Sequence, residues 1–201
     1  MQTVHGIRFL PVARIGGMQL GLDARWLSVR GLGLMLLLTL ATMAGQLGQD
    51  LGSPVWLRLC TASLIVPAIV LTSLGHELGH VVASRLAGLS VRAVVLGPQG
   101  GMTIRASSAE PAVDFLTALA GPLANAAQGS VCIWLALVLQ LEGPLFTFVV
   151  ELAALQLLTA AANLIPVGPM DGRRMLQAWR AASTTRTLVP VPAVSPRLIA
   201  G

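Results

Sequence analysis

Four apolar stretches, each long enough to cross a lipid bilayer, constrain this chain more than any other feature. A transmembrane helix needs about 20 consecutive apolar residues. Only 10% of the residues are charged, against roughly 25% in soluble domains. The sequence therefore predicts an all-α polytopic membrane protein with about four transmembrane helices, at about residues 27–47, 57–82, 113–140 and 145–166.

The placement of the arginines predicts how the chain is oriented. The chain has thirteen basic residues, all of them arginine. Positive residues gather in cytoplasmic loops, so both termini and the segment 84–112 are expected in the cytoplasm of a bacterial cell. This bias explains the basic character of the chain, and a nucleic-acid partner is not needed. The arginines on this side are Arg8, Arg14, Arg25, Arg30, Arg85, Arg92, Arg105, Arg173, Arg174, Arg180, Arg186 and Arg197.

The first apolar stretch has an alternative interpretation as a secretory signal peptide. Residues 41–44, Ala-Thr-Met-Ala, imitate a cleavage site. The segment before this stretch, about thirty residues, is too long for the charged region of a signal peptide. A transmembrane helix is therefore the preferred interpretation.

Alternating patterns outside the apolar stretches predict short cytoplasmic β-hairpins. Over residues 18–23, apolar residues alternate with residues that are polar or small. This period of two is typical of a strand, and residues 7–12 are a candidate partner strand. The segments 91–96 and 102–105 flank the sequence Gly-Pro-Gln-Gly-Gly, which is typical of a hairpin turn.

The C-terminal part predicts a helix and a tail. Residues 173–182 are compatible with an amphipathic surface helix, and 183–201 are rich in Ser, Thr, Pro and Val. That composition favours a mobile tail. A single membrane-embedded domain is thus expected over residues 1–182.

The second apolar stretch ends in His76-Glu77-Leu-Gly-His80, the pattern H-E-x-x-H. On an α-helix, residues i and i+4 lie one turn apart on the same face, so both imidazoles can bind one zinc ion. Glu77 then stands within reach of the water that completes such a site and is the candidate catalytic base. Chance is a poor explanation, because the chain has three histidines in all and ionisable groups at an apolar helix end are costly.

A catalytic zinc ion normally has three protein ligands, so a third one must be found. His5 is the remaining histidine and lies near the N-terminus, which favours a carboxylate. Asp171 follows the fourth stretch on the side of His80, within a Pro/Gly-broken segment, and such backbone is tolerated at membrane depth where it lines a cavity. An incidental acidic residue in a helix-stop loop is the alternative. The less suitable carboxylates are Asp23, Asp50, Glu110, Asp114, Glu142 and Glu151.

Three motifs lie in order on or beside separate apolar stretches. They are His76-Glu77-x-x-His80, Ala120-Gly121-Pro122-Leu-Ala-Asn125, and Asn163-x-x-Pro166-x-x-Pro169-x-Asp171-Gly172. Together they resemble the signatures of the site-2 protease family of intramembrane zinc metalloproteases. The resemblance covers about residues 5–180.

This resemblance implies a three-helix catalytic core, formed by the second to fourth stretches, that cleaves a transmembrane protein near the cytoplasmic face. It implies one zinc ion per chain and a substrate such as an anti-sigma factor or another single-span regulator. By the same resemblance, the zinc ligands are His76, His80 and Asp171, the base is Glu77, and the substrate-contacting residues are Asn163, Pro166 and Pro169.

The chain also departs from the family pattern. Arg173 follows the Asp171-Gly172 pair where the family often has glycine, which is a mild change. No PDZ insertion, CBS domain or further apolar stretch is visible, so the chain resembles a minimal member. Regulation by such modules is expected to be absent or to come from a membrane partner.

Polar residues within the apolar stretches have two interpretations each. The amides of Asn125 and Asn163 are costly to bury unpaired, so they are expected to donate to substrate carbonyls, to an oxyanion or to each other. Contacts between helices are the alternative. For Glu151 and Gln156, packing and a water-filled path both stay open.

The predicted function is hydrolysis of a peptide bond in or near the transmembrane segment of a membrane protein. A zinc-binding membrane interaction protein and a metal transporter are the alternatives. The retained Glu77 disfavours the first, and a transporter would be expected to spread its ligands over several spans. Because hydrolysis needs an extended peptide, an exposed strand within 91–105 is a candidate for pairing with the substrate.

Overall fold

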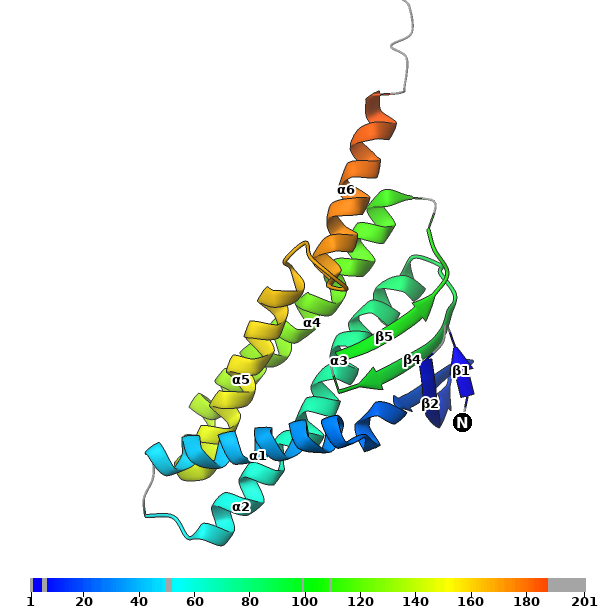
Figure 1. The fold of residues 1–201 in the computed structure, drawn as a ribbon. Helices are drawn as coiled ribbons and strands as arrows, with labels where there is room; N and C mark the ends of the chain where they lie inside the picture. The colour runs from blue at the N-terminus through cyan, green and yellow to red at the C-terminus, as the bar shows by residue number, and fades with distance from the viewer. Residues whose placement is uncertain (1, 5–6, 50–51, 99, 109, 188–201) are drawn as a thin grey trace, which may run out of the picture.

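The computed structural model describes residues 2–4, 7–49, 52–98, 100–108 and 110–187 (Figure 1). Within these residues, four helical segments are long and apolar enough to cross a membrane: Val29–Gly48, Val55–Leu86, Pro111–Val138 and Gly143–Asn163. The four transmembrane spans predicted from the sequence are therefore confirmed. The chain is a mostly helical, multi-pass membrane protein.

The second span consists of two helices, whereas its apolar sequence predicted one continuous stretch. Helix α2 covers Val55–Ser63 and α3 covers Ile65–Leu86. The helices meet just before Pro67, whose ring would clash with the carbonyl group of Ser63, four residues earlier, in a continuous helix. The break therefore has a local cause. It leaves the H-E-x-x-H motif in the C-terminal half of α3.

The helices α3, α4 (Pro111–Val138) and α5 (Gly143–Asn163) lie side by side and form the expected three-helix core. Helix α1 (Val29–Gln49) crosses this core obliquely, and α6 (Asp171–Thr187) lies along the beginning of α4 (Figure 1). Glycines bring the core helices close. A Cβ atom at Gly79 of α3 would lie 2.6 Å from the backbone oxygen of Ala120 in α4, and such small residues permit close helix packing.

Helix α6 is longer than the surface helix expected over 173–182. It begins at Asp171 and continues to Thr187, five residues into the segment that was expected to be a tail. In its last turns, Ser183 Oγ and Thr184 Oγ1 each donate to the carbonyl group four residues earlier, at 3.1 Å. The remainder of the expected tail, 188–201, lies outside the described residues.

Five strands form one sheet beside the C-terminal half of α3. Both predicted hairpins are confirmed, because β2 (Ile7–Ile15) pairs antiparallel with β3 (Met18–Asp23), and β4 (Val91–Gly97) pairs antiparallel with β5 (Gly100–Arg105). The sequence did not indicate that β3 pairs parallel with β4 and thereby joins the hairpins, with Leu20 opposite Val94. The order of the strands within the sheet is β1 (Gln2–Val4), β2, β3, β4 and β5.

Apolar side chains pack on both faces of this sheet. The cluster between the sheet and α3 comprises Met18, Val81, Val94 and Leu96, and the cluster on the opposite face comprises Phe9, Ala93, Val95 and Ile104. The short helix η1 (Ala24–Leu27) connects the sheet to α1, and Trp26 Nε1 donates to the backbone oxygen of Leu96 at 3.1 Å. The sheet is thus held firmly against the helix that carries the motif.

Candidate metal centre

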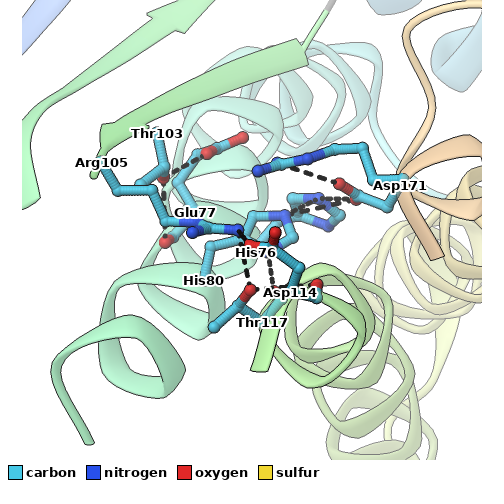
Figure 2. A network of polar contacts seen from close by, with 9 residues as sticks. His76, Glu77, His80, Thr103, Arg105, Asp114, Thr117 and Asp171 are labelled. Carbon is cyan, nitrogen blue, oxygen red and sulfur yellow. Dashed lines mark hydrogen bonds and ion pairs between the residues drawn. The ribbon is translucent and has the colours of Figure 1, made fainter. Parts of the chain in front are cut away.

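His76 and His80 of α3 meet Asp171, the first residue of α6, at a single point (Figure 2). The Nε2 atoms of the two histidines are 3.2 Å apart. Asp171 Oδ2 lies 3.1 Å from His76 Nε2 and 3.3 Å from His80 Nε2. All three side chains are buried. The i, i+4 spacing aligns the imidazoles, and the turn after α5, with Gly168 at a positive φ of 54°, returns the chain to them.

These three separations fit a tetrahedral metal site. Bonds of about 2.0–2.1 Å from zinc to nitrogen or oxygen place neighbouring ligand atoms about 3.3 Å apart. The three atom pairs measure 3.1, 3.2 and 3.3 Å. His76, His80 and Asp171 therefore form a group that can hold a metal ion.

The backbone of α4 orients the second imidazole. His80 Nδ1 lies 2.7 Å from the backbone oxygen of Thr117. A carbonyl oxygen can only accept, so Nδ1 carries the proton and the lone pair of Nε2 points to the metal position. Arg105 of β5 contacts the first turns of α4, where Thr117 lies. It donates to Thr117 Oγ1 at 2.9 Å and to Asp114 Oδ1 at 2.7 Å (Figure 2).

The Asp171 carboxyl group is held in its ionised form. Burial by itself would raise the pKa of Asp171, but the contacts with His76 and His80 outweigh burial and keep this pKa well below its usual range. The other carboxylate oxygen, Oδ1, lies 3.9 Å from Arg174 Nη1. Because a metal ligand must be deprotonated, this environment suits a carboxylate ligand.

Gly121 of α4 lies directly against the two imidazoles. A Cβ atom at this position would be 2.6 Å from His76 Nε2 and would overlap the His80 ring. Glycine is thus the residue that leaves space for the metal position. The absence of a side chain at Gly121 therefore has two effects. It lets α4 pack closely against α3, and it leaves space for the two imidazoles.

Glu77 is buried beside the metal-binding group, with 4% of its surface exposed. Its Oε2 atom accepts a hydrogen bond of 2.6 Å from Thr103 Oγ1 of β5. The sequence alone does not point to Thr103, because nothing in the local pattern of β5 shows which residue of α3 lies opposite.

A cavity of about 490 Å³ connects these groups with most of the other predicted site residues. Asn125, Asn163 and Pro169 line this cavity, whereas Pro166 is exposed in the turn and does not. Asn125 is 1% exposed, and neither polar atom of its side chain has a hydrogen-bond partner among the described residues. Asn163 Nδ2 donates to the backbone oxygen of Thr159 at 3.1 Å.

Two further polar residues of α5, Gln156 and Glu151, each contact another transmembrane helix. Gln156 Nε2 donates to Thr72 Oγ1 of α3 at 2.8 Å. A Cβ atom at Gly45 of α1 would overlap Glu151 Oε1, so the Glu151 side chain packs directly against α1. Both side chains therefore connect helices at their positions.

The sequence profile of the Peptidase M50B-like family matches residues 52–170. The chain belongs to the Peptidase M50B-like family. The matched segment begins three residues before α2 and ends at the residue before Asp171, so it contains α2, the H-E-x-x-H helix α3, α4 and α5.

Relatives of this M50B-like chain carry protease names. A protein of Mycobacterium tuberculosis named as a zinc metalloprotease, Rip3, is 33% identical over 178 residues, which cover 85% of this chain and 44% of Rip3. A protein of Synechocystis sp., also named as a zinc metalloprotease, is 31% identical over 156 residues, 71% of this chain and 38% of that protein. The chain therefore spans less than half the length of these relatives.

The fold also matches a solved structure. The site-2 protease from Methanocaldococcus jannaschii superposes with a TM-score of 0.60 at 20% identity, over 87% of this chain and 73% of the other. The resemblance to site-2 proteases noted from the sequence motifs is therefore confirmed for the fold and the family.

Proposed function

We propose that the chain is an intramembrane zinc metalloprotease that hydrolyses a peptide bond in or near the transmembrane segment of a membrane protein. The observation that carries this proposal is the cluster of His76, His80 and Asp171 at the spacing of zinc ligands, with the buried carboxyl group of Glu77 beside it in a cavity. The names of its M50B-like relatives support the same activity.

One zinc ion held by His76, His80 and Asp171 would polarise the scissile carbonyl group and lower the pKa of the attacking water. Glu77 accepts the proton of that water and then delivers it to the leaving amine. The burial of these groups strengthens their electrostatic interactions, because little water screens them.

The remaining residues of the cavity are proposed to bind the substrate. The Asn125 amide, which has no partner among the described residues, donates to the oxyanion. An unpaired buried amide costs about 1–3 kcal/mol, which favours a partner that arrives with the substrate. Asn163 and Pro169 contact the peptide inside the cavity, and Pro166 contacts it outside.

The substrate is proposed to be a single-span membrane protein, such as an anti-sigma factor, that enters from the bilayer. From the bias of the arginines we propose that the sheet and both termini lie in the cytoplasm. Cleavage near the cytoplasmic face, with regulation by a separate membrane partner, is part of the same proposal. The strand β5 ends the strand order of the sheet and lines the cavity through Gly100–Thr103. An extended substrate segment can therefore add to this edge.

The variant Glu77→Gln tests the activity, because it retains the shape of the side chain and removes the base. We expect the purified variant to retain one zinc ion per chain and to lose cleavage of dye-quenched casein, an unfolded generic substrate. In cells, a membrane protein should accumulate uncut. Equal cleavage by wild type and variant would refute proteolysis at this site, and loss of zinc in the variant would instead favour a site built for metal binding or transport.

A further inference from the structure

Two residues of β5 lie against the carboxyl group of Glu77. Thr103 Oγ1 donates to Glu77 Oε2 at 2.6 Å and lies 3.4 Å from the Glu77 backbone oxygen (Figure 2). At Gly101, a Cβ atom would overlap the Glu77 side chain and lie 2.6 Å from Oε1. The strand thus approaches Glu77 closely enough to fix one carboxylate oxygen.

The distance between the hydroxyl and carboxylate groups indicates a strong hydrogen bond. Bonds from a hydroxyl group to an ionised oxygen are typically about 2.5–2.7 Å long and roughly twice as strong as neutral ones. The glutamate side chain has several rotatable bonds, so without such a partner the carboxylate can turn away from the metal position. A catalytic base must lie within about 3 Å of the proton that it takes.

We propose that Thr103 is a positioning residue for the catalytic base. Its hydroxyl group holds Glu77 Oε2 and leaves Oε1 for proton transfer. This inference rests on the proposed proteolytic function and goes beyond it, because it gives the cytoplasmic sheet a part in the chemical step as well as in substrate binding.

A purely structural role for the hydroxyl group makes a different prediction. If the Thr103 hydroxyl only attached the sheet to α3, its loss would disturb the metal site and the base together. The sheet is, however, also held against α3 by the apolar cluster that contains Val81 and Val94. Removal of one hydroxyl group should therefore leave the sheet, the imidazoles and the zinc in place.

The experiment compares Thr103→Val, which keeps the shape and removes the hydroxyl group, with Thr103→Ser, which keeps the hydroxyl group. With dye-quenched casein, we expect Thr103→Val to lower kcat at least about 10-fold, with KM within about 2-fold of wild type. Thr103→Ser should stay within about 3-fold in both constants, since it retains the donor. Thr39→Val, which removes a hydroxyl group bonded within α1 to the backbone oxygen of Met35 at 3.0 Å, is the matched control and should cleave normally.

Two further measurements do not depend on cleavage. Thr103→Val should retain one zinc ion per chain. In the metal-free protein, Thr103→Val should lower the melting temperature when Glu77 is present and have little effect in the Glu77→Ala background, because the hydrogen bond is then already absent.

The outcomes separate this inference from the proposed function. Unchanged kcat in Thr103→Val, alongside an inactive Glu77→Gln variant, would overturn the positioning role and leave the protease assignment intact. Loss of zinc in Thr103→Val, or an equal loss of activity in Thr103→Ser, would also overturn it, because both results indicate a structural role. If Glu77→Gln itself cleaves normally, the proposed function fails first.

Discussion

The substitution Gly121→Ala should empty the metal centre while the fold survives. The added Cβ atom would lie 2.6 Å from His76 Nε2 and nearer still to the His80 ring, whereas non-bonded carbon and nitrogen atoms prefer about 3.5 Å. At least one imidazole must therefore move by roughly 1 Å. Metal–ligand distances tolerate about 0.2 Å, and a displacement of 1 Å at a reacting centre costs about 100-fold in rate.

We expect purified Gly121→Ala to retain less than about 0.1 zinc ion per chain after dialysis and to cleave dye-quenched casein at least about 100-fold more slowly. The fold should persist, because overpacking costs about 1–3 kcal/mol and alanine is favoured over glycine in a helix by about 1 kcal/mol. Gly33→Ala in α1, where nothing lies within 4 Å of an added Cβ atom, is the control and should keep its zinc. A fully loaded, active Gly121→Ala variant would refute the close approach of α4 to the imidazoles.

Three further perturbations test other parts of the structure. Asp171→Ala should bind zinc at least about 10-fold more weakly by competition with a chelator, because two imidazoles remain, and equal affinity would exclude this ligand. Trp26→Phe should destabilise the protein by about 1 kcal/mol in chemical unfolding followed by circular dichroism, through the lost bond to Leu96, and an unchanged midpoint would contradict that bond. Burial alone would raise the pKa of Asp23, but hydrogen bonds from Arg25 outweigh burial and lower this pKa. The ionised Asp23 therefore stabilises the folded protein above about pH 3.9. This stabilisation is lost as the pH falls through the lowered pKa. Asp23→Asn should therefore lower the melting temperature at pH 6 and approach wild type as the pH falls below about 3.9. Parallel pH profiles would argue against the interaction.

The features that the sequence revealed are those encoded over short distances along the chain. Hydropathy alone locates the transmembrane spans, because the bilayer requires about 20 apolar residues in a row. The i, i+4 spacing of His76 and His80 defines one helix face without knowledge of any neighbour. Asp171 lies 91 residues beyond His80 and was reached by elimination and by the resemblance, since no local rule brings it to the imidazoles.

The features that the sequence did not reveal depend on contacts between distant segments, with two exceptions. The parallel pairing of β3 with β4 and the contact of Thr103 with Glu77 join residues that no local pattern relates. The break before Pro67 did have a local signal, in the clash expected in an unbroken helix. The extension of α6 to Thr187 was not expected, because Ser and Thr favour loops. In the structure, the hydroxyl groups of Ser183 and Thr184 donate to helical carbonyl groups four residues earlier.

The position of the proposed catalytic groups around α3 explains why such a centre would need both a helix bundle and a sheet. Successive residues of an α-helix are rotated by about 100°, so Glu77 points about 100° away from His76 and about 60° away from His80. The imidazoles face α4 and α6, which supply Gly121 and Asp171, while Glu77 faces β5, which supplies Thr103. Changes on the α4 side should therefore act on metal content, and changes on the β5 side on kcat with the metal retained. If Gly121→Ala and Thr103→Val gave the same profile of zinc loss and rate loss, the two sides of α3 would not act separately, and this division of roles would be wrong.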